Sequence, residues 1–336
     1  MRMRSDRPRI HLMLSPATLT SQGADRLDMV RYSPQRSGRE RLTGEELLAA
    51  LPELAQVAQV SVDASNPHPN ATLEDIRQLA QAASAALARS DVDGLVLIHG
   101  TNGLEETAFF LHLTLRTQKP VVVTGAQRPF TALSSDGPIN LLDAFRVAAS
   151  KEAREAGVLV VVNNQIHSAR DVTKTSTYRL HTFQSRPFGP LGDVDSDRVN
   201  FHRGAIRRHT YQSEFDATKI EAVPRVDVLY VYSGARADLV TASAERGAKG
   251  IVVAGVGAGS TGELREELAT LSRAGKVVVV RSSRVGEGRV IVDDNWQEPG
   301  MVAAEDLSPH KAAILLTISL TKTSDPNRIQ ELFQAY

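Results

Sequence analysis

Residues 94–115 read GLVLIHGTNGLEETAFFLHLTL and contain a strand, a turn and a helix in one continuous stretch. The segment Gly94–Ile98 is short and apolar, which is typical of a strand buried on both faces of a parallel sheet. The segment Leu104–Leu115 has the helical period of apolar side chains. The turn at residues 99–103 therefore connects a buried strand directly to a helix.

The same alternation of strand and helix continues along the chain. The strand-like runs are Ile10–Leu14, Gln59–Val62, Gly94–Ile98, Pro120–Thr124, Val158–Val162, Val226–Tyr232, Gly250–Ala254 and Lys276–Val280. The helical stretches are Gly44–Val57, Leu73–Arg89, Leu104–Leu115, Ile139–Ala149, Asp238–Arg246 and Glu263–Ala274. Strands that alternate with helices predict the α/β class, here with doubly wound, mostly parallel sheets.

The length of 336 residues suggests about two domains. The alternation breaks between Asp171 and Pro224, where polar and turn residues dominate. We expect a larger N-terminal domain at 1–205, a linker at 206–224 and a smaller C-terminal domain at 225–336. A second polar stretch, residues 21–41, interrupts a strand-to-helix connection that usually has about two to six residues. Such a long loop is typical of a functional lid.

Composition narrows the classes of partner and of chemistry. Lys and Arg number 39, as do Asp and Glu, so no global positive field would attract nucleic acid or an anionic membrane surface. The chain contains no cysteine, which excludes disulfides, cysteine-ligated metals and cysteine nucleophiles. Ile10–Leu14 is too short for a signal-peptide core, and no run reaches the length of a membrane span. We expect a cytoplasmic protein that binds a small molecule.

The residues that follow the strands are the candidates for a site, because ligands of open parallel sheets bind at the carboxyl ends of the strands. These segments are Ser15-Pro16-Ala17-Thr18, Ala64-Ser65-Asn66, His99-Gly100-Thr101-Asn102 and Gly125-Ala126-Gln127-Arg128. Thr18 and Thr101 thus lie where reactive groups are usually displayed.

Two of these patterns have both a functional and a structural explanation. The hydroxyl of Thr101 precedes a helix whose free backbone N–H groups can stabilise an oxyanion. Asn102 followed by Glu105, however, is also a common helix-capping pattern. Lys174 lies among hydroxyl residues at 171–177, where burial would lower its pKa and make it a base. The alternative is an ordinary surface lysine.

Neither a cofactor nor a metal ion is expected. Residues 257–262 fit the dinucleotide-binding pattern G-x-G-x-x-G, but Arg281 stands where the ribose-binding acid of that motif would end the next strand. The nine histidines show no metal-binding spacing, and Asp293-Asp294 is a lone acidic pair.

Seven motifs in order give the chain a resemblance to the bacterial L-asparaginase (asparaginase/glutaminase) family over nearly its whole length. They are HGT-x-x-LEETAFFL at 99–111, KPVVVTGAQRP at 119–129, SSDGPINLLDA at 134–144, RDVTKTST at 170–177, FGPLG at 188–192, IVVAGVGAG at 251–259 and VVRSSR at 279–284. The resemblance implies two α/β domains and a homotetramer of tight dimers, in which a neighbour's C-terminal domain completes each site.

The resemblance also implies amide hydrolysis through a threonine acyl-enzyme. By position, the family's nucleophile corresponds to Thr18, the supporting pair to Thr101 and Lys174, and the tyrosine of the lid to Tyr32. The substrate-binding positions implied by the family correspond to Ser65, Asn66, Gly100, Asn102 and Ala126.

Several family positions differ here, and the differences share one direction. Pro16-Ala17 replaces G-G before the nucleophile, and Asn102 replaces the Asp of H-G-T-D. The family's G-S-Q-D aligns with residues 63–66 (DASN), its G-N-G-N with 257–260 (GAGS), and no acid aligns near Ile291 with the glutamate that a neighbouring subunit contributes. These changes remove polar groups that bind the charged ends of a free amino acid.

Three functions remain open from the sequence. The first is an amidohydrolase whose substrate is not free L-asparagine. The second is a weakened genuine L-asparaginase that releases ammonia and aspartate. The third is a non-catalytic ligand-binding or scaffold homologue. Because Asn102 carries no charge, we also expect Lys174 to have a lower pKa than the family's lysine.

Overall fold

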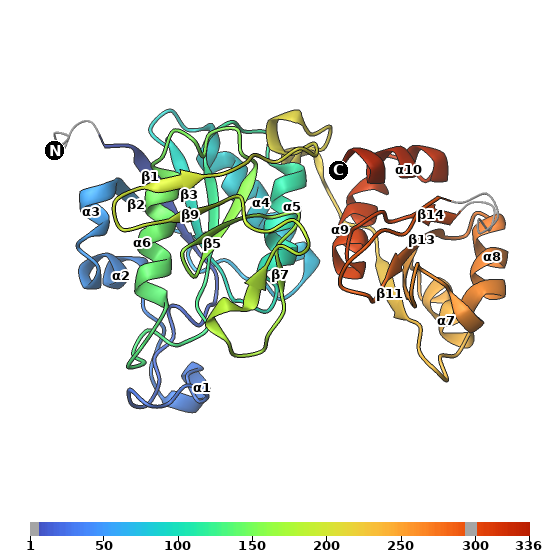
Figure 1. The fold of residues 1–336 in the computed structure, drawn as a ribbon, viewed down its shortest axis with the longest axis horizontal. Helices are drawn as coiled ribbons and strands as arrows, with labels where there is room; N and C mark the ends of the chain where they lie inside the picture. The colour runs from blue at the N-terminus through green and yellow to red at the C-terminus, as the bar shows by residue number, and fades with distance from the viewer. Residues whose placement is uncertain (1–6, 293–300) are drawn as a thin grey trace. The chain divides into compact units, whose positions relative to one another are not determined.

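The computed structural model describes residues 7–292 and 301–336, and the chain divides into two compact units, Met1–Lys219 and Ile220–Tyr336. Each unit is built on its own sheet (Figure 1). The predicted α/β class, with a larger N-terminal and a smaller C-terminal part, is confirmed.

The sheet of the first unit has the strand order β10-β9-β6-β5-β4-β3-β1-β2. Its strands are β1 (Arg9–Leu14), β2 (Gln59–Val62), β3 (Gly94–Ile98), β4 (Val121–Thr124), β5 (Val158–Val162), β6 (Gln165–Ser168), β9 (Gly192–Val194) and β10 (Val199–Phe201). Strands β1 to β5 pair in parallel, whereas β6, β9 and β10 extend the sheet with antiparallel pairs. The carboxyl ends of β1, β3 and β4 therefore lie side by side.

Helices cover both faces of this sheet: α2 (Gly44–Ala50), α3 (Leu54–Val57), α4 (Leu73–Ala88), α5 (Leu104–Thr114) and α6 (Gly137–Ala148). The short helix α1 (Pro34–Ser37) buries no residue and lies away from the sheet (Figure 1). Figure 1 shows α6 on one face and α4 and α5 on the other. The predicted single helix at 44–57 is two helices, because Pro52 lacks an N–H and disfavours helical backbone at Leu51. Almost every residue of α5 is buried, including the polar Glu105, Thr107 and His112, so this helix is packed on all sides.

The antiparallel extension begins at a tight turn that was not predicted. Asn163 and Asn164 have φ angles of 52° and 59°, the left-handed pair that a type I′ hairpin requires and that asparagine tolerates. Helix α6 fixes the turn, because Asn140 Oδ1 accepts from the Asn163 N–H at 2.9 Å and Asp143 Oδ2 accepts from Asn164 Nδ2 at 2.8 Å.

The segment after β6 contains only short elements: β7 (Thr173–Lys174), η2 (Leu180–Thr182), β8 (Phe183–Gln184), η3 (Thr210–Gln212) and η4 (Ala217–Lys219). Much of the expected linker at 206–224 belongs to the first unit. Ser213, Phe215 and Ala217 are almost completely buried, and the division between the units follows Lys219.

The second unit has a four-stranded parallel sheet formed by β11 (Val226–Tyr230), β12 (Gly250–Gly255), β13 (Val278–Ser283) and β14 (Met301–Ala303). Its helices are α7 (Asp238–Glu245), η5 (Gly262–Leu264), α8 (Arg265–Arg273), α9 (Pro309–Ser319) and α10 (Pro326–Ala335). The G-x-G-x-x-G segment does connect β12 to η5 and α8. Arg281 is buried, and its Nη2 donates to the Ile291 carbonyl at 3.1 Å.

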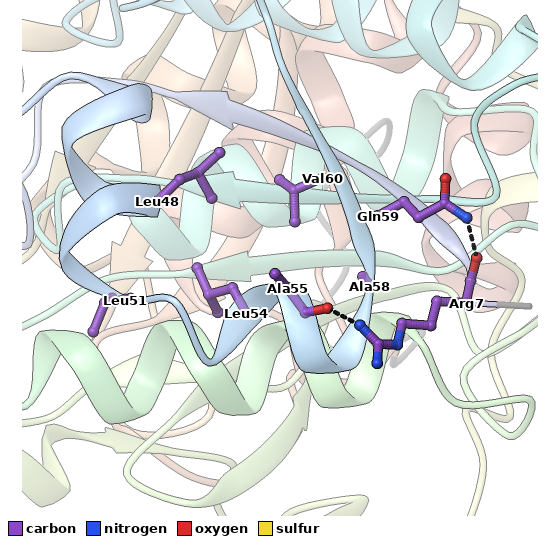
Figure 2. Close-up of a pocket in the computed structure, with 8 residues that line it drawn as sticks. All are labelled: Arg7, Leu48, Leu51, Leu54, Ala55, Ala58, Gln59 and Val60. Atoms are coloured by element: carbon purple, nitrogen blue, oxygen red, sulfur yellow. Dashed lines mark hydrogen bonds between the residues drawn. The ribbon is translucent and has the colours of Figure 1, made fainter. Parts of the chain in front are cut away.

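An apolar pocket of about 520 Å³ lies beside α2, α3 and β2 of the first unit. Figure 2 shows the side chains of Leu48, Leu54 and Val60 around it, with the Arg7 guanidinium donating to the Ala55 carbonyl at its edge. The pocket borders Gln59, the first residue of β2. It therefore lies at the amino end of that strand, away from the carboxyl ends where a parallel sheet binds its ligand.

Asp143 on α6 is a buried carboxyl, 3.5 Å from Arg146 Nη1. Burial raises the pKa of Asp143 to about 6, although the Arg146 charge and the Asn164 hydrogen bond oppose the shift. A carboxyl whose pKa is raised on folding contributes stability below its unfolded pKa, and this contribution is lost as the pH rises through the folded pKa.

We therefore expect Asp143→Asn to gain stability over the wild type as the pH rises from about 4 to about 7. The gain should be on the order of 2 kcal/mol, since each pKa unit corresponds to about 1.4 kcal/mol and an amide oxygen can still accept from Asn164. Urea unfolding of both proteins across this range measures the difference. A difference in unfolding free energy that is independent of pH would contradict the expectation.

Candidate active site

The loops that follow β1, β3 and β4 approach one another closely at the carboxyl edge of the sheet. The Ser15 N–H donates to the Ile98 carbonyl at 2.8 Å. A β-carbon on Gly100 would lie 2.8 Å from the Pro16 carbonyl oxygen, and one on Gly125 would lie 2.7 Å from the His99 carbonyl oxygen. Only glycine permits such approaches, so the two glycines let the three loops form one surface.

Lys174 and Thr101, which are distant in sequence, form a hydrogen-bonded pair. The Lys174 Nζ donates to Thr101 Oγ1 at 2.9 Å and lies 3.4 Å from Asn102 Oδ1. Thr101 is buried, Lys174 is half-buried and Asn102 is exposed. The lysine is therefore not an ordinary surface lysine, and its amine contacts the side chains of both residues at the end of β3.

Glu105 is a functional candidate that the sequence analysis missed. Its Oε1 accepts the backbone N–H of Lys174 at 3.0 Å, and its side chain is buried in the first turn of α5. Burial lowers the pKa of Lys174, and the negative charge of Glu105 partly opposes this shift. The acidic pair Glu105-Glu106 at the start of a mostly apolar helix is the sequence signal that could have drawn attention to Glu105.

The capping interpretation of Asn102 and Glu105 is wrong. The residue that caps α5 is Gly103, and no side chain caps that helix. The side chains of Asn102 and Glu105 are instead hydrogen-bonded to Lys174. The side-chain groups that would form a capping box at the start of α5 therefore bind a residue from a distant segment instead.

Thr18 and Tyr32 form a second group. Thr18 Oγ1 donates to the Tyr32 hydroxyl at 3.5 Å, and both residues are half-buried. Tyr32 lies in the 21–41 segment, which is attached to the loop after β4 by backbone hydrogen bonds from Phe130 to Ser21 at 2.8 Å and from Leu133 to Arg26 at 2.9 Å. Among the described residues, no hydrogen bond joins Thr18 directly to Thr101, Asn102 or Lys174.

Ser65 and Asn66 lie in the loop after β2. Ser65 is exposed, and its N–H donates to Asp63 Oδ1 at 2.8 Å. Asn66 Oδ1 accepts the Leu14 N–H at 2.7 Å, whereas its amide nitrogen is buried without a hydrogen-bond partner. The carbonyl side of the Asn66 amide thus binds the protein itself, and only the N–H side is free to bind another group.

Gly100 and Ala126 lie in the loops that follow β3 and β4. Ala126 is buried. The Gly100 carbonyl accepts a hydrogen bond from His99 Nδ1 at 2.8 Å. Because a carbonyl can only accept, His99 carries its proton on Nδ1. Its Nε2 is then the acceptor of the hydrogen bond from Thr107 Oγ1. Burial lowers the pKa of His99 to about 4, so this neutral ring orients the Gly100 backbone at physiological pH.

In residues 7–292 and 301–336, no group of three or more His, Asp or Glu side chains has the geometry to hold a metal ion. Asp293 and Asp294 lie outside the described residues. None of the helices in that part of the chain is long and apolar enough to cross a membrane.

Comparison with known proteins identifies the family. The model of the N-terminal asparaginase domain matches residues 18–207, and that of the glutaminase/asparaginase C-terminal domain matches residues 225–333. L-asparaginase 2 of Bacillus subtilis is 38% identical over 99% of this chain and 88% of its own length. A glutaminase-asparaginase of Pseudomonas fluorescens is 39% identical over 97% of this chain and 90% of its own length.

A solved structure has the same fold. The crystal structure of a probable cytoplasmic L-asparaginase from Campylobacter jejuni superposes with a TM-score of 0.90, at 38% identity, over 98% of this chain and all of that one. The overall fold described above is thus shared with a relative of known structure. The chain belongs to the asparaginase family of amidohydrolases.

Proposed function

We propose that the protein hydrolyses an amide with Thr18 as nucleophile and the Thr101–Lys174 pair for proton transfer, and that its substrate has no free α-amino group. The single observation that carries the catalytic part is the 2.9 Å hydrogen bond between the Lys174 amine and Thr101, at the end of a central strand. Together with burial that lowers the pKa of Lys174, it supports a neutral amine as general base.

In the proposed reaction, Thr18 Oγ attacks the amide carbonyl and its proton passes to the Thr101–Lys174 pair. Backbone N–H groups of the strand-end loops stabilise the oxyanion of the tetrahedral intermediate. The C–N bond then breaks, and the departing nitrogen takes the proton from the pair. Water hydrolyses the acyl-Thr18 ester by the same proton route in reverse. Tyr32, which accepts a hydrogen bond from Thr18, covers the nucleophile from the lid.

Asn102 supports the substrate part of the proposal. Its amide oxygen lies 3.4 Å from the Lys174 amine and carries no charge, so it cannot form an ion pair with a substrate ammonium group. Loss of a desolvated carboxylate partner costs a few kcal/mol, or about a hundredfold in affinity. Because the Asn102 side chain is uncharged, it does not stabilise the charged form of the Lys174 amine as a carboxylate would.

Weak L-asparaginase activity is the second candidate. The names of relatives 38–39% identical to this chain support it. In this alternative, Asn102 and Ser65 would replace part of the lost recognition with neutral hydrogen bonds. The homotetramer of tight dimers and the cytoplasmic location stay predictions, supported by the family and, for location, by the name of the Campylobacter jejuni relative.

We expect Thr18→Ala to abolish acylation of the protein by p-nitrophenyl acetate. This ester is activated, so it can react with the nucleophile even if the site does not recognise its leaving group. Thr18→Ser keeps a hydroxyl and should retain part of the rate, so it is the matched control. Intact-mass and peptide mass spectrometry would locate the acetyl group. Acetylation that persists at the same rate in Thr18→Ala would exclude Thr18 as the nucleophile, and a wild type that is never acetylated would favour a non-catalytic homologue.

Succinamic acid tests the proposed substrate class, because it is L-asparagine without the α-amino group. We expect ammonia release from succinamic acid to have a kcat/KM at least equal to that for L-asparagine, since the site offers no carboxylate at position 102 for the ammonium. Both reactions can be followed by the same ammonia assay. A preference for L-asparagine of tenfold or more would favour the second candidate.

Asn102→Asp should move the pH dependence of acylation toward higher pH. A carboxylate beside the Lys174 amine favours its charged form and raises its pKa, so less of the neutral base is present at a given pH. With p-nitrophenyl acetate, the acylation rate near pH 7 should fall and the rising limb should shift upward. Asn102→Ser, which adds no charge, should leave the limb in place. An unshifted limb in Asn102→Asp would exclude Lys174 as the titrating base.

A further inference from the structure

The loop at residues 63–70 holds the backbone that leads into Thr18. Leu14, the last residue of β1, donates its N–H to Asn66 Oδ1 at 2.7 Å and accepts the His68 N–H on its carbonyl at 2.7 Å. Asn70 Nδ2 lies 3.4 Å from the Pro16 carbonyl, to which it donates. Three hydrogen bonds from one loop therefore hold the segment from Leu14 to Pro16.

The loop is in turn closed by a hydrogen bond between two of its own side chains. Asp63 Oδ2 accepts from His68 Nε2 at 2.9 Å, while Asp63 Oδ1 accepts the Ser65 N–H at 2.8 Å. The side chains of Asp63 and His68 are only 15% and 12% exposed. His11 on β1 lies behind them, with its Nε2 4.0 Å from the same Asp63 oxygen and its Nδ1 2.9 Å from Ser61 Oγ.

The Asp63 carboxylate stays ionised at neutral pH. Burial alone would raise the pKa of Asp63, but the hydrogen bonds from Ser65 and His68 outweigh burial and hold it below its ordinary value. Because a carboxylate only accepts, His68 must carry a proton on Nε2. The pair is thus a charge-assisted hydrogen bond in a largely buried place, where such bonds are strong.

The turn before Thr18 depends on partners outside itself. Pro16 has no backbone N–H and cannot contribute a donor to the turn. The N–H of Ser15 is bound by β3, through the Ile98 carbonyl at 2.8 Å. The other hydrogen bonds described for Leu14 and Pro16 come from residues 66–70, so the position of the turn depends on the conformation of that loop.

We propose that His68 and Asp63 are positioning residues for Thr18. Their hydrogen bond closes the 63–70 loop, and the loop holds Leu14 and Pro16 so that Thr18 is correctly placed. The inference rests on the proposed role of Thr18 as nucleophile. Neither side chain needs to touch the substrate, and a displacement of about 1 Å in the reacting geometry costs up to about a hundredfold in rate.

Hydrogen–deuterium exchange of a peptide covering residues 13–18 tests the clamp without any substrate. We expect His68→Ala to increase exchange in this peptide, because the Leu14 N–H loses its ordered acceptor. His68→Gln, which places an amide N–H near the position of Nε2, should restore protection. His202→Ala removes a similar 2.8 Å hydrogen bond, made to the partly exposed Asp193 on β9, and should leave the exchange of the 13–18 peptide unchanged.

Acylation by p-nitrophenyl acetate tests the consequence for Thr18. His68→Ala should lower the maximal acylation rate about tenfold to a hundredfold, with little change in the half-saturating concentration, and His68→Gln should recover most of the rate. Asp63→Ala, which also removes the acceptor of the Ser65 N–H, should lower the rate at least as much. The double variant should lose no more than Asp63→Ala alone, since His68 acts through its hydrogen bond to Asp63.

Each outcome decides a separate point. Unchanged exchange of residues 13–18 in His68→Ala overturns the clamp, whatever the activity. Increased exchange with an unchanged acylation rate overturns the positioning role and leaves a purely structural pair. If the wild type itself is not acylated, the proposed nucleophile fails, while the exchange of the same peptide still decides whether the pair holds the turn.

Discussion

The parallel pairing of β1 with β3 is the contact on which the site depends. It joins Leu14 to Ile98 in register, so that the turn leading to Thr18 and the turn carrying Thr101 leave the sheet at the same edge. The two turns can touch because Gly100 has no β-carbon to collide with the Pro16 carbonyl. A side chain at that position would force the two threonine-bearing turns apart.

The electrostatics of the site are centred on one lysine. Burial destabilises the charged form of Lys174, and the Glu105 carboxylate stabilises it. The same carboxylate accepts the Lys174 backbone N–H at 3.0 Å, so it both fixes the strand β7 to helix α5 and sets the charge near the amine. With a neutral Asn102 in contact, burial is the larger influence on the pKa of Lys174 and lowers it, in the direction that the proposed role of general base requires.

The departures from the family pattern are connected by geometry. Pro16 removes a donor from the turn before Thr18, and the loop at 63–70, where the family's G-S-Q-D has become DASN, supplies hydrogen bonds to that same turn. Asn66 thereby binds backbone with its carbonyl and leaves only a buried N–H available. Loss of groups for an amino-acid substrate and support of a reshaped turn thus involve the same few residues.

The local patterns of the sequence determined most of the central strands, because a short run of branched apolar side chains between turn residues is typical of a buried strand and of few other structures. β3 and β5 begin and end where they were predicted. The family motifs placed Thr18, Thr101 and Lys174 as a set. Helix α9 had no clear periodic signal of its own, since it is apolar nearly all round. Helix α10 has one, with Ile329, Leu332 and Phe333 buried, and it was not predicted.

Only the tertiary structure decided which residues hold the candidate site residues in place. Glu105 looked like a capping residue until Lys174, from a distant segment, provided its hydrogen-bond partner. The Asp63–His68 pair had no recognisable motif, and its contact with Leu14 follows from the pairing of β2 with β1. Local sequence therefore specified the strands and the candidate side chains of the site. Contacts between distant segments decided the charge, orientation and support of those side chains, because these properties depend on distances that no local pattern encodes.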